Sequence, residues 1–311
     1  VDGYWGKYLT PYVNGDYGIY ANDSTPTGRT PATFAFDYGS WNADSGIYIG
    51  GCRDCNAVIT NSHSEYNPLG YSGTNAGGEL YIINSEWDHN AAGITPNTLT
   101  SEPDLPQDGV YVANNYIHDN NQKNIPGAGI TSIAPVGMGV EIAGGNNDII
   151  RNNLIVNQKH DGVILHWLYT PTTRNQVLSN RFKHVGYAGG PTDADIVDDI
   201  TGVQNCFDYN VDITGGKKAP ATVNPPNLLN LENCGAKNPG RKQLTGIYEP
   251  GNPLVVVEAL LNAVGITEKK DYKGPGPHPE AQMTMPNPCK GVPDNPWCTE
   301  GKPVFTAPSH D

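Results

Sequence analysis

Short apolar runs interrupted by asparagine recur along the first two thirds of the chain. Six segments share this pattern: NAVITNSHSEYN (56–67), ELYIINSEWDHN (79–90), GVYVANNYIHDNN (109–121), DIIRNNLIVNQK (148–159), QVLSNRFKHVG (176–186) and GVQNCFDYN (202–210). In each segment an apolar residue stands two positions before an asparagine; the pairs are Ile59 and Asn61, Ile82 and Asn84, Val112 and Asn114, Ile150 and Asn152, Leu178 and Asn180, and Val203 and Asn205. Successive asparagines are 23 to 38 residues apart, which is typical of a repeat protein.

A glycine that opens a short strand forms a second recurring feature. These glycines are Gly18, Gly46, Gly70, Gly93, Gly139 and Gly162. The pattern of each repeat therefore predicts, in chain order, a glycine turn, a strand, a variable loop, a second strand, an asparagine turn and a third strand. One such coil cannot bury its inward side chains alone, whereas stacked coils share a continuous core. Asparagine tolerates left-handed backbone at a bend, so we expect the six asparagines to stack as an amide ladder inside the turn.

The repeats also resemble a known family. The segments NGDYGIYA (14–21), DSGIYIGGCRDCNAVIT (44–60), LGYSGTNAGG (69–78), AGITPN (92–97) and AGGNND (143–148) are similar to secreted actinobacterial β-helix-repeat proteins. Those proteins have the right-handed parallel β-helix architecture of the pectate-lyase-like family. The resemblance covers about residues 14–212 and implies an all-β right-handed parallel β-helix of about six to seven coils within residues 1–212. Because Val1 already lies inside a coil, we expect the N-terminal coils and cap to be missing from this sequence.

The asparagine pattern stops near residue 213. Gly215, Gly216 and the prolines that follow predict an irregular linker over 213–252. Asn252 and Pro253 are typical of the start of a helix, and Gly265 is typical of a helix end. We therefore expect a short helix over 253–265 that packs on the solenoid. Residues 266–311 are rich in proline and predict an extended tail with a disulfide loop, able to contact a partner or a second copy.

Composition and charge limit the classes of molecule that this protein is expected to bind. Glycine is abundant, with 37 residues, which disfavours a helical bundle. The formal net charge is −13, and residues 1–150 alone hold 16 acidic and 4 basic residues. Nucleic acid requires the opposite sign, so we expect no nucleic-acid partner. A neutral polysaccharide or a cation suits this surface better than a polyanionic glycan does. No apolar run is long enough to predict a transmembrane segment.

The six cysteines predict disulfides and therefore an extracellular, secreted protein. Six cysteines allow about fifteen pairings, and nearest-neighbour pairing is the simplest: Cys52 with Cys55, Cys206 with Cys234, and Cys289 with Cys298. The Cys52–Cys55 motif could instead be a redox or metal pair, but no second such motif completes a zinc site.

Strand alternation predicts a grid of ionisable groups on three adjacent coils. Residues two and four positions after each asparagine should face solvent; they are His63 and Glu65, Glu86 and Asp88, and Tyr116 and His118. Paired carboxylates cleave glycosidic bonds, so Glu65, Glu86, Asp88 and His118 are the candidate catalytic residues, with His63 and Tyr116 as candidate substrate ligands. Alternatively, His63, His118 and Asp88 could hold a divalent metal. A third interpretation is a solvated outer face with no chemistry.

A second candidate site follows the glycine-led strands. Glu141 and His166 are expected to face outward there as candidate substrate ligands, near Asp161 and an acidic rim of Asp193, Asp195, Asp198 and Asp199. Such a rim could bind Ca²⁺ or another divalent metal through oxygen ligands, the only cofactor that the sequence indicates. Tyr20, Tyr48 and Trp167 are expected to be exposed and could stack on sugar rings.

The leading functional hypothesis is an extracellular carbohydrate-active protein that binds or acts on a polysaccharide along the side of the solenoid, by hydrolase- or lyase-type chemistry. This follows from the family resemblance, and one fold hosts many functions. The alternative is a non-catalytic secreted scaffold or assembly subunit, or a metal-handling accessory β-helix protein.

Overall fold

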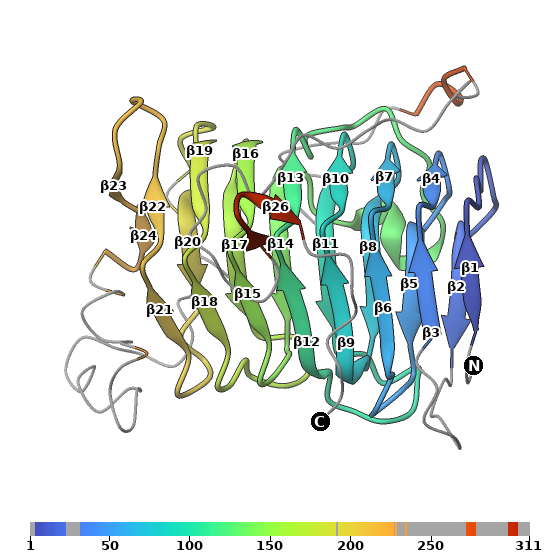
Figure 1. The fold of residues 1–311 in the computed structure, drawn as a ribbon, viewed down its shortest axis with the longest axis horizontal. Coiled ribbons are helices and arrows are strands. Elements are labelled where there is room, and N and C mark those ends of the chain that lie inside the picture. Colours follow the sequence, from blue (N-terminus) through green and yellow to red (C-terminus); the bar gives the residue numbers. More distant parts are fainter. Residues whose placement is uncertain are drawn as a thin grey trace.

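The computed structural model describes residues 4–22, 32–190, 192–226, 228, 234, 272–277 and 298–303. Within them the chain passes repeatedly through three sheets, A, B and C, of eight strands each (Figure 1). Sheet A contains β1 (Trp5–Lys7), β3 (Ala32–Ala35), β6 (Ala57–Thr60), β9 (Gly77–Ile83), β12 (Asp108–Ala113), β15 (Ile149–Arg151), β18 (Gln176–Leu178) and β21 (Cys206–Asp208). Sheet B contains β4 (Tyr38–Ser40), β7 (His63–Glu65), β10 (Glu86–Asp88), β13 (Tyr116–His118), β16 (Leu154–Gln158), β19 (Arg181–Val185), β22 (Val211–Asp212) and β23 (Ala219–Pro220). Sheet C contains β2 (Ile19–Asn22), β5 (Ser45–Gly50), β8 (Leu69–Thr74), β11 (Ala92–Asn97), β14 (Met138–Ala143), β17 (Asp161–His166), β20 (Ala194–Asp198) and β24 (Val223–Asn224).

Nearly every strand pair is parallel, and the pairing joins one coil to the next. The fold is therefore an all-β parallel β-helix, as the repeats predict. It has about eight turns, one more than the upper prediction, because sheet A already begins at β1 and sheet C extends to β24. These outer strands lack the asparagine motif, so the repeat pattern does not reveal them. A 3-10 helix, η1 (Gly129–Ile133), and a small antiparallel pair, β25 (Cys298–Thr299) and β26 (Lys302–Pro303), complete the described elements.

The core lies inside the three sheets, where inward apolar side chains of most strands stack on their counterparts in the next coil. The predicted inward residues Ile59, Ile82, Val112 and Ile150 are fully buried. The prediction is wrong for the last two coils. Val177 pairs with Ile150 and is the buried residue in place of Leu178, and Val203 is 44% exposed. Strand β18 keeps the register of β15, but the left-handed turn residue of this coil is Ser179 and not Asn180, so Val177 is the inward residue. Val203 lies at a different corner of the coil.

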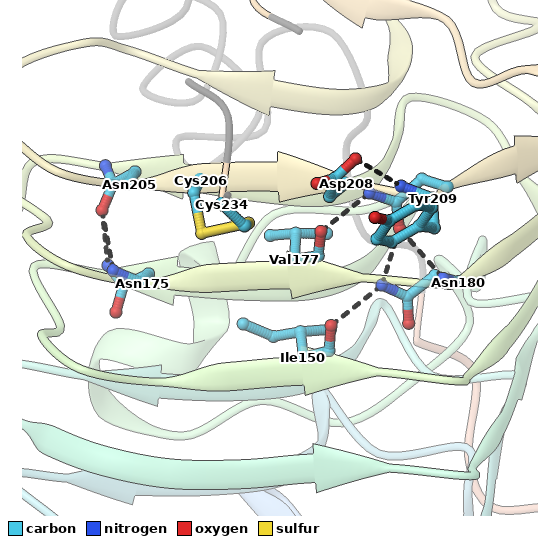
Figure 2. Close-up of a disulfide and its surroundings, with 10 residues drawn as sticks. Ile150, Asn175, Val177, Asn180, Asn205, Cys206, Asp208, Tyr209 and Cys234 are labelled. Carbon is cyan, nitrogen blue, oxygen red and sulfur yellow. Dashed lines mark hydrogen bonds between the residues drawn. A yellow bond between two sulfur atoms is a disulfide. The ribbon is translucent and has the colours of Figure 1, made fainter. Parts of the chain in front are cut away.

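The asparagine turn is real, but its amide ladder is formed one residue later than predicted. Asn61, Asn84, Asn114 and Asn152 have left-handed backbone, with φ between 50° and 55°, and the amide N–H of Asn84 donates to the carbonyl preceding Asn114. The ladder itself consists of the next residues along the chain, Asn115, Asn153, Asn180 and Asn210, whose successive Nδ2–Oδ1 distances are 3.1, 2.9 and 3.0 Å. Asn180 is thus a ladder residue rather than a turn residue (Figure 2).

Two further corners carry polar ladders of their own. Asn42, Asn67, Asn90 and Asn120 stack between sheets B and C, and Gln158 continues this column. Asn175 and Asn205 stack at the third corner, 3.2 Å apart (Figure 2), so Asn205 does not belong to the column of Asn61. In every ladder the side chain also bonds the backbone of a neighbouring coil, which satisfies polar groups that the corner would otherwise bury unpaired.

The glycine column exists because adjacent coils touch there. A Cβ at Gly93 would lie 2.5 Å from the carbonyl oxygen of Gly139, and one at Gly139 would lie 2.5 Å from that of Gly162. These contacts are too short for any side chain. The glycines therefore set the close packing of the coils along sheet C.

Two of the three predicted disulfides are present: Cys52 with Cys55, and Cys206 with Cys234 (Figure 2). Cys289 lies outside the described residues, so its pairing with Cys298 stays a prediction. The predicted helix over 253–265 and most of the predicted linker and tail also lie outside them. Among the described residues, no helix has the length and apolar character needed to cross a membrane.

Candidate functional site

The six-residue grid predicted from strand alternation is present on the outer face of sheet B. Strand β10 pairs with β7 on one side and β13 on the other, and the register places Glu86 beside His63 and Tyr116. In the same way Asp88 lies beside Glu65 and His118. The residues between them, including Trp87 and Ile117, face the core and are fully buried.

Histidines and carboxylates in this grid form one connected network. Asp88 bonds His63 Nε2 through Oδ1 and His89 Nδ1 through Oδ2, and His118 Nε2 lies 3.8 Å from Asp88 Oδ2. His118 Nε2 is also 2.9 Å from Glu86 Oε1, while its Nδ1 is 2.7 Å from Asp119 Oδ2. We call His63, Glu65, Glu86, Asp88 and His118 the sheet B cluster.

The expectation that these side chains face solvent freely is wrong. Glu86 is 4% exposed and His118 9%, and the remainder of the sheet B cluster is buried to a similar degree. The cause is mutual shielding: the Tyr38 hydroxyl donates to Glu65 at one end, and the Tyr116 ring stacks on His118 at the other, with ring centroids 3.9 Å apart. Little of the sheet B cluster is therefore available for contact with a polysaccharide chain.

Ion pairing dominates the titration of this network. Burial lowers the pKa of His118, but its bonds to Asp119 and Glu86 outweigh burial and raise the pKa to about 9. Burial likewise lowers the pKa of His63, but its hydrogen bond to Asp88 and the charge of that carboxylate outweigh burial, so the pKa rises. Burial raises the pKa of Asp88, yet the bonds from His63 and His89 reverse this and hold it well below its usual value. The histidines thus carry the positive charge that balances the buried carboxylates.

A separate cavity of about 500 Å³ lies on the outer face of sheet C. Its floor is formed by outward residues of successive coils: Tyr48, Ser72, Thr95 and Glu141. One wall comes from the loop after β11, through Leu99, Ser101 and Glu102, and the other from Thr131, Ala134 and Pro135 in and after η1. His166 and Trp167 close one end. Its size suits a small ligand or a few sugar units.

A carboxylate–histidine pair stands on the cavity floor. Glu141 Oε1 is 2.8 Å from His166 Nε2, and Glu141 Oε2 is 3.4 Å from the Thr95 hydroxyl. Burial lowers the pKa of His166, but the hydrogen bond and charge of Glu141 outweigh burial and raise it. The pairing with Glu141 therefore favours the protonated form of His166 and holds its ring in place.

Glu102 is a second carboxylate of the cavity, and sequence reasoning missed it. It accepts a hydrogen bond from the Tyr48 hydroxyl, although the two residues are 54 positions apart. Nothing in the sequence marks Glu102, because it lies in a loop outside the repeats. Its bond to Tyr48, together with the Tyr17 ring packed 4.5 Å from that of Tyr48, explains why Tyr48 is buried and not exposed as expected.

Exposed aromatic rings lie beside the cavity. Trp167, which lines it, is 47% exposed, and Tyr20 is 54% exposed, as the sequence predicts. Tyr20 stacks on Tyr48 with ring centroids 5.1 Å apart. Both rings can stack on a sugar that leaves the cavity along the sheet.

The predicted acidic rim does not line this cavity, because its residues serve local structure. Each aspartate holds a side chain or a backbone amide nearby: Asp193 pairs with His160, Asp195 accepts from Thr222, Asp198 from Ile200 and Asp199 from Trp167. Asp161 is buried on β17 and is also absent from the lining. The structure thus separates the predicted site residues into the sheet B cluster with Tyr116, and a cavity group of Tyr48, Glu141 and His166.

Comparison with known proteins gives one structural match. No protein-family model and no curated protein matches the sequence. Among solved structures, the chain is similar to the A-module of mannuronan C-5 epimerase AlgE4 from Azotobacter vinelandii, with 12% identity, a TM-score of 0.43 and 68% of each chain covered. Likeness at this level does not bear on the reaction, and the fold stands on the strand pairing alone.

Proposed function

We propose that this protein binds a neutral polysaccharide in the sheet C cavity and hydrolyses a glycosidic bond there. The observation that carries the proposal is the lining itself: two glutamates, Glu102 and Glu141, a histidine paired with one of them, and aromatic rings at the margin. A concave site with a few convergent polar groups is the ordinary form of a ligand site. We further infer an extracellular location, which the two disulfides support.

The charge of the cavity favours a neutral substrate. Its described lining includes Asp44, Glu102 and Glu141 but no lysine or arginine. A uronate polymer would bring further negative charge to these three carboxylates, and His166, which could offset it, is already paired with Glu141. Lyase chemistry removes a proton beside a sugar carboxylate, which a neutral glycan does not have. Hydrolysis by paired carboxyl groups therefore fits the cavity better than elimination does.

The roles follow from the contacts. Glu141 is fixed by His166 and Thr95 and serves as the carboxylate that acts at the anomeric carbon or on water. Glu102 is the second glutamate of the lining, and we assign protonation of the departing oxygen to its acid form. Trp167 and Tyr20 hold sugar units outside the cleavage point.

The test is release of reducing ends from a panel of neutral and acidic polysaccharides, with binding measured by affinity electrophoresis. We expect activity on a neutral glycan, lowered about 10²- to 10⁴-fold by Glu141→Gln or Glu102→Gln. Glu79→Gln, an exposed carboxylate on sheet A, is the matched control and should retain activity. Wild-type rates in both cavity variants would refute the assignment, and cleavage of acidic glycans alone would refute the substrate class.

A further inference from the structure

The sheet B cluster is unused by the proposed hydrolysis, since it lies on a different sheet from the cavity. It gathers three carboxylates and two histidines that are buried on the outer face of sheet B, where an ionisable group is costly unless it is paired. Two overlapping sets of ligand atoms each lie within 4.8 Å of one another: His63, Glu65 and Asp88, and Glu86, Asp88 and His118. Asp88 belongs to both sets.

Two buried atoms in the sheet B cluster have no hydrogen-bond partner among the described residues. They are Glu86 Oε2 and His63 Nδ1, and the Glu86 and His63 side chains are only 5% and 3% exposed. A carboxylate oxygen buried without a donor is costly. A cation held between Glu86, Asp88 and His118 would satisfy the Glu86 oxygen directly.

The orientation of His118 is that of a metal-binding histidine. Its Nδ1 lies 2.7 Å from Asp119 Oδ2, which fixes the ring and leaves Nε2 directed at Glu86 and Asp88. A carboxylate that orients the far nitrogen of a histidine is the usual outer-shell partner of a metal ligand. Asp119 is in turn bonded by the Asn157 amide of the next coil.

We propose that the sheet B cluster binds a divalent transition metal, with Asp88 as the ligand shared between its two halves. One half offers His63 and Glu65, and the other Glu86 and His118. Mixed imidazole and carboxylate ligands suit Zn²⁺ or a similar ion, whereas Ca²⁺ prefers oxygen ligands alone. The two ligand sets lie on β7, β10 and β13 and share Asp88, so metal binding would link three consecutive coils.

The test is isothermal titration of the chelator-treated, full-length protein with ZnCl₂ and, separately, with CaCl₂. We expect Zn²⁺ to bind more tightly than Ca²⁺, and Asp88→Asn to weaken Zn²⁺ binding by more than about 100-fold, beyond the loss caused by removal of an outer-shell partner. Asp193→Asn is the matched control, because it breaks the His160–Asp193 pair, which includes none of the proposed ligands, and should leave Zn²⁺ binding unchanged.

A second variant keeps the proposal testable if Asp88→Asn does not fold. Asp119→Asn keeps every proposed ligand and should weaken Zn²⁺ binding about 10- to 100-fold, with an unchanged circular dichroism spectrum. Absence of Zn²⁺ binding to the wild type, tighter binding of Ca²⁺, or equal Zn²⁺ affinity in folded Asp88→Asn or Asp119→Asn would overturn the proposal.

Discussion

Replacement of Asp148 by asparagine should stabilise the protein at alkaline pH and remove part of its pH dependence. Asp148 is fully buried at the corner before β15. Its Oδ1 accepts from Gln107 Nε2 at 2.7 Å and from the Val110 amide at 2.8 Å, but Oδ2 has no partner among the described residues. The next two coils have asparagine at this corner, Asn175 and Asn205.

Burial raises the pKa of Asp148 from 3.8 to about 7, against the hydrogen bonds from Gln107 and Val110 that lower it. The folded state therefore binds more protons than the unfolded state between these two values, and stability falls as the pH rises through them. At a pH above both pKa values, the charged carboxylate lowers the free energy of unfolding by about 4 kcal/mol. Asparagine keeps the acceptor oxygen and carries no charge, so the cost should disappear.

The assay is urea unfolding of the oxidised protein at pH 5 and pH 8. Asp148→Asn should exceed the wild type by up to about 4 kcal/mol at pH 8, and this advantage should shrink toward pH 5. Buried Asp37 and Asp195, whose pKa values burial also raises, to about 7 and about 6, are common to both proteins and cancel in the comparison. Exposed Asp16→Asn should follow the wild type. Parallel pH profiles for Asp148→Asn and the wild type would refute the reasoning.

Two other substitutions test the corners and the coil contacts. Asn153→Ala removes bonds to the Asn115 amide, the Val112 carbonyl and Asn180, so the free energy of unfolding should fall by about 3 kcal/mol. Asn61→Gly, at a left-handed turn with φ of 50°, should change the free energy of unfolding by less than about 1 kcal/mol. Equal losses for the two variants in urea unfolding would contradict the ladder assignment. Gly93→Ala places a Cβ 2.5 Å from the Gly139 carbonyl oxygen and should lower the free energy of unfolding by about 1–3 kcal/mol. The control is Gly15→Ala, whose added Cβ would have no atom within 4 Å. Equal thermal midpoints for the two variants would count against the close contact.

The sequence predicts the coil and the register of its central strands, because one inward apolar residue and one turn residue recur in each coil. Asn84 does stack above Asn114, and this places Glu86 beside His63 and Tyr116 as expected. The sequence pattern places the ladder one residue too early, because two adjacent asparagines such as Asn114 and Asn115 differ only in backbone conformation. Periodicity alone does not say which of the two turns inward.

The cavity could not be predicted from the repeats. Outward positions Tyr48 and Glu141 follow from alternation, but Glu102 and the η1 segment come from loops of irregular length that fold back over sheet C. Strand alternation also does not predict that the sheet B cluster is buried. That burial depends on contacts between outward side chains, such as the stacking of Tyr116 on His118, which alternation treats as exposed.

The most direct test of the proposed function is a crystal structure of Glu141→Gln with an oligosaccharide of the preferred glycan. The account predicts sugar density in the sheet C cavity, with the scissile bond between Glu102 and residue 141 and a neighbouring sugar ring stacked on Trp167. Sugar bound instead over β7, β10 and β13, with the cavity empty, would contradict it.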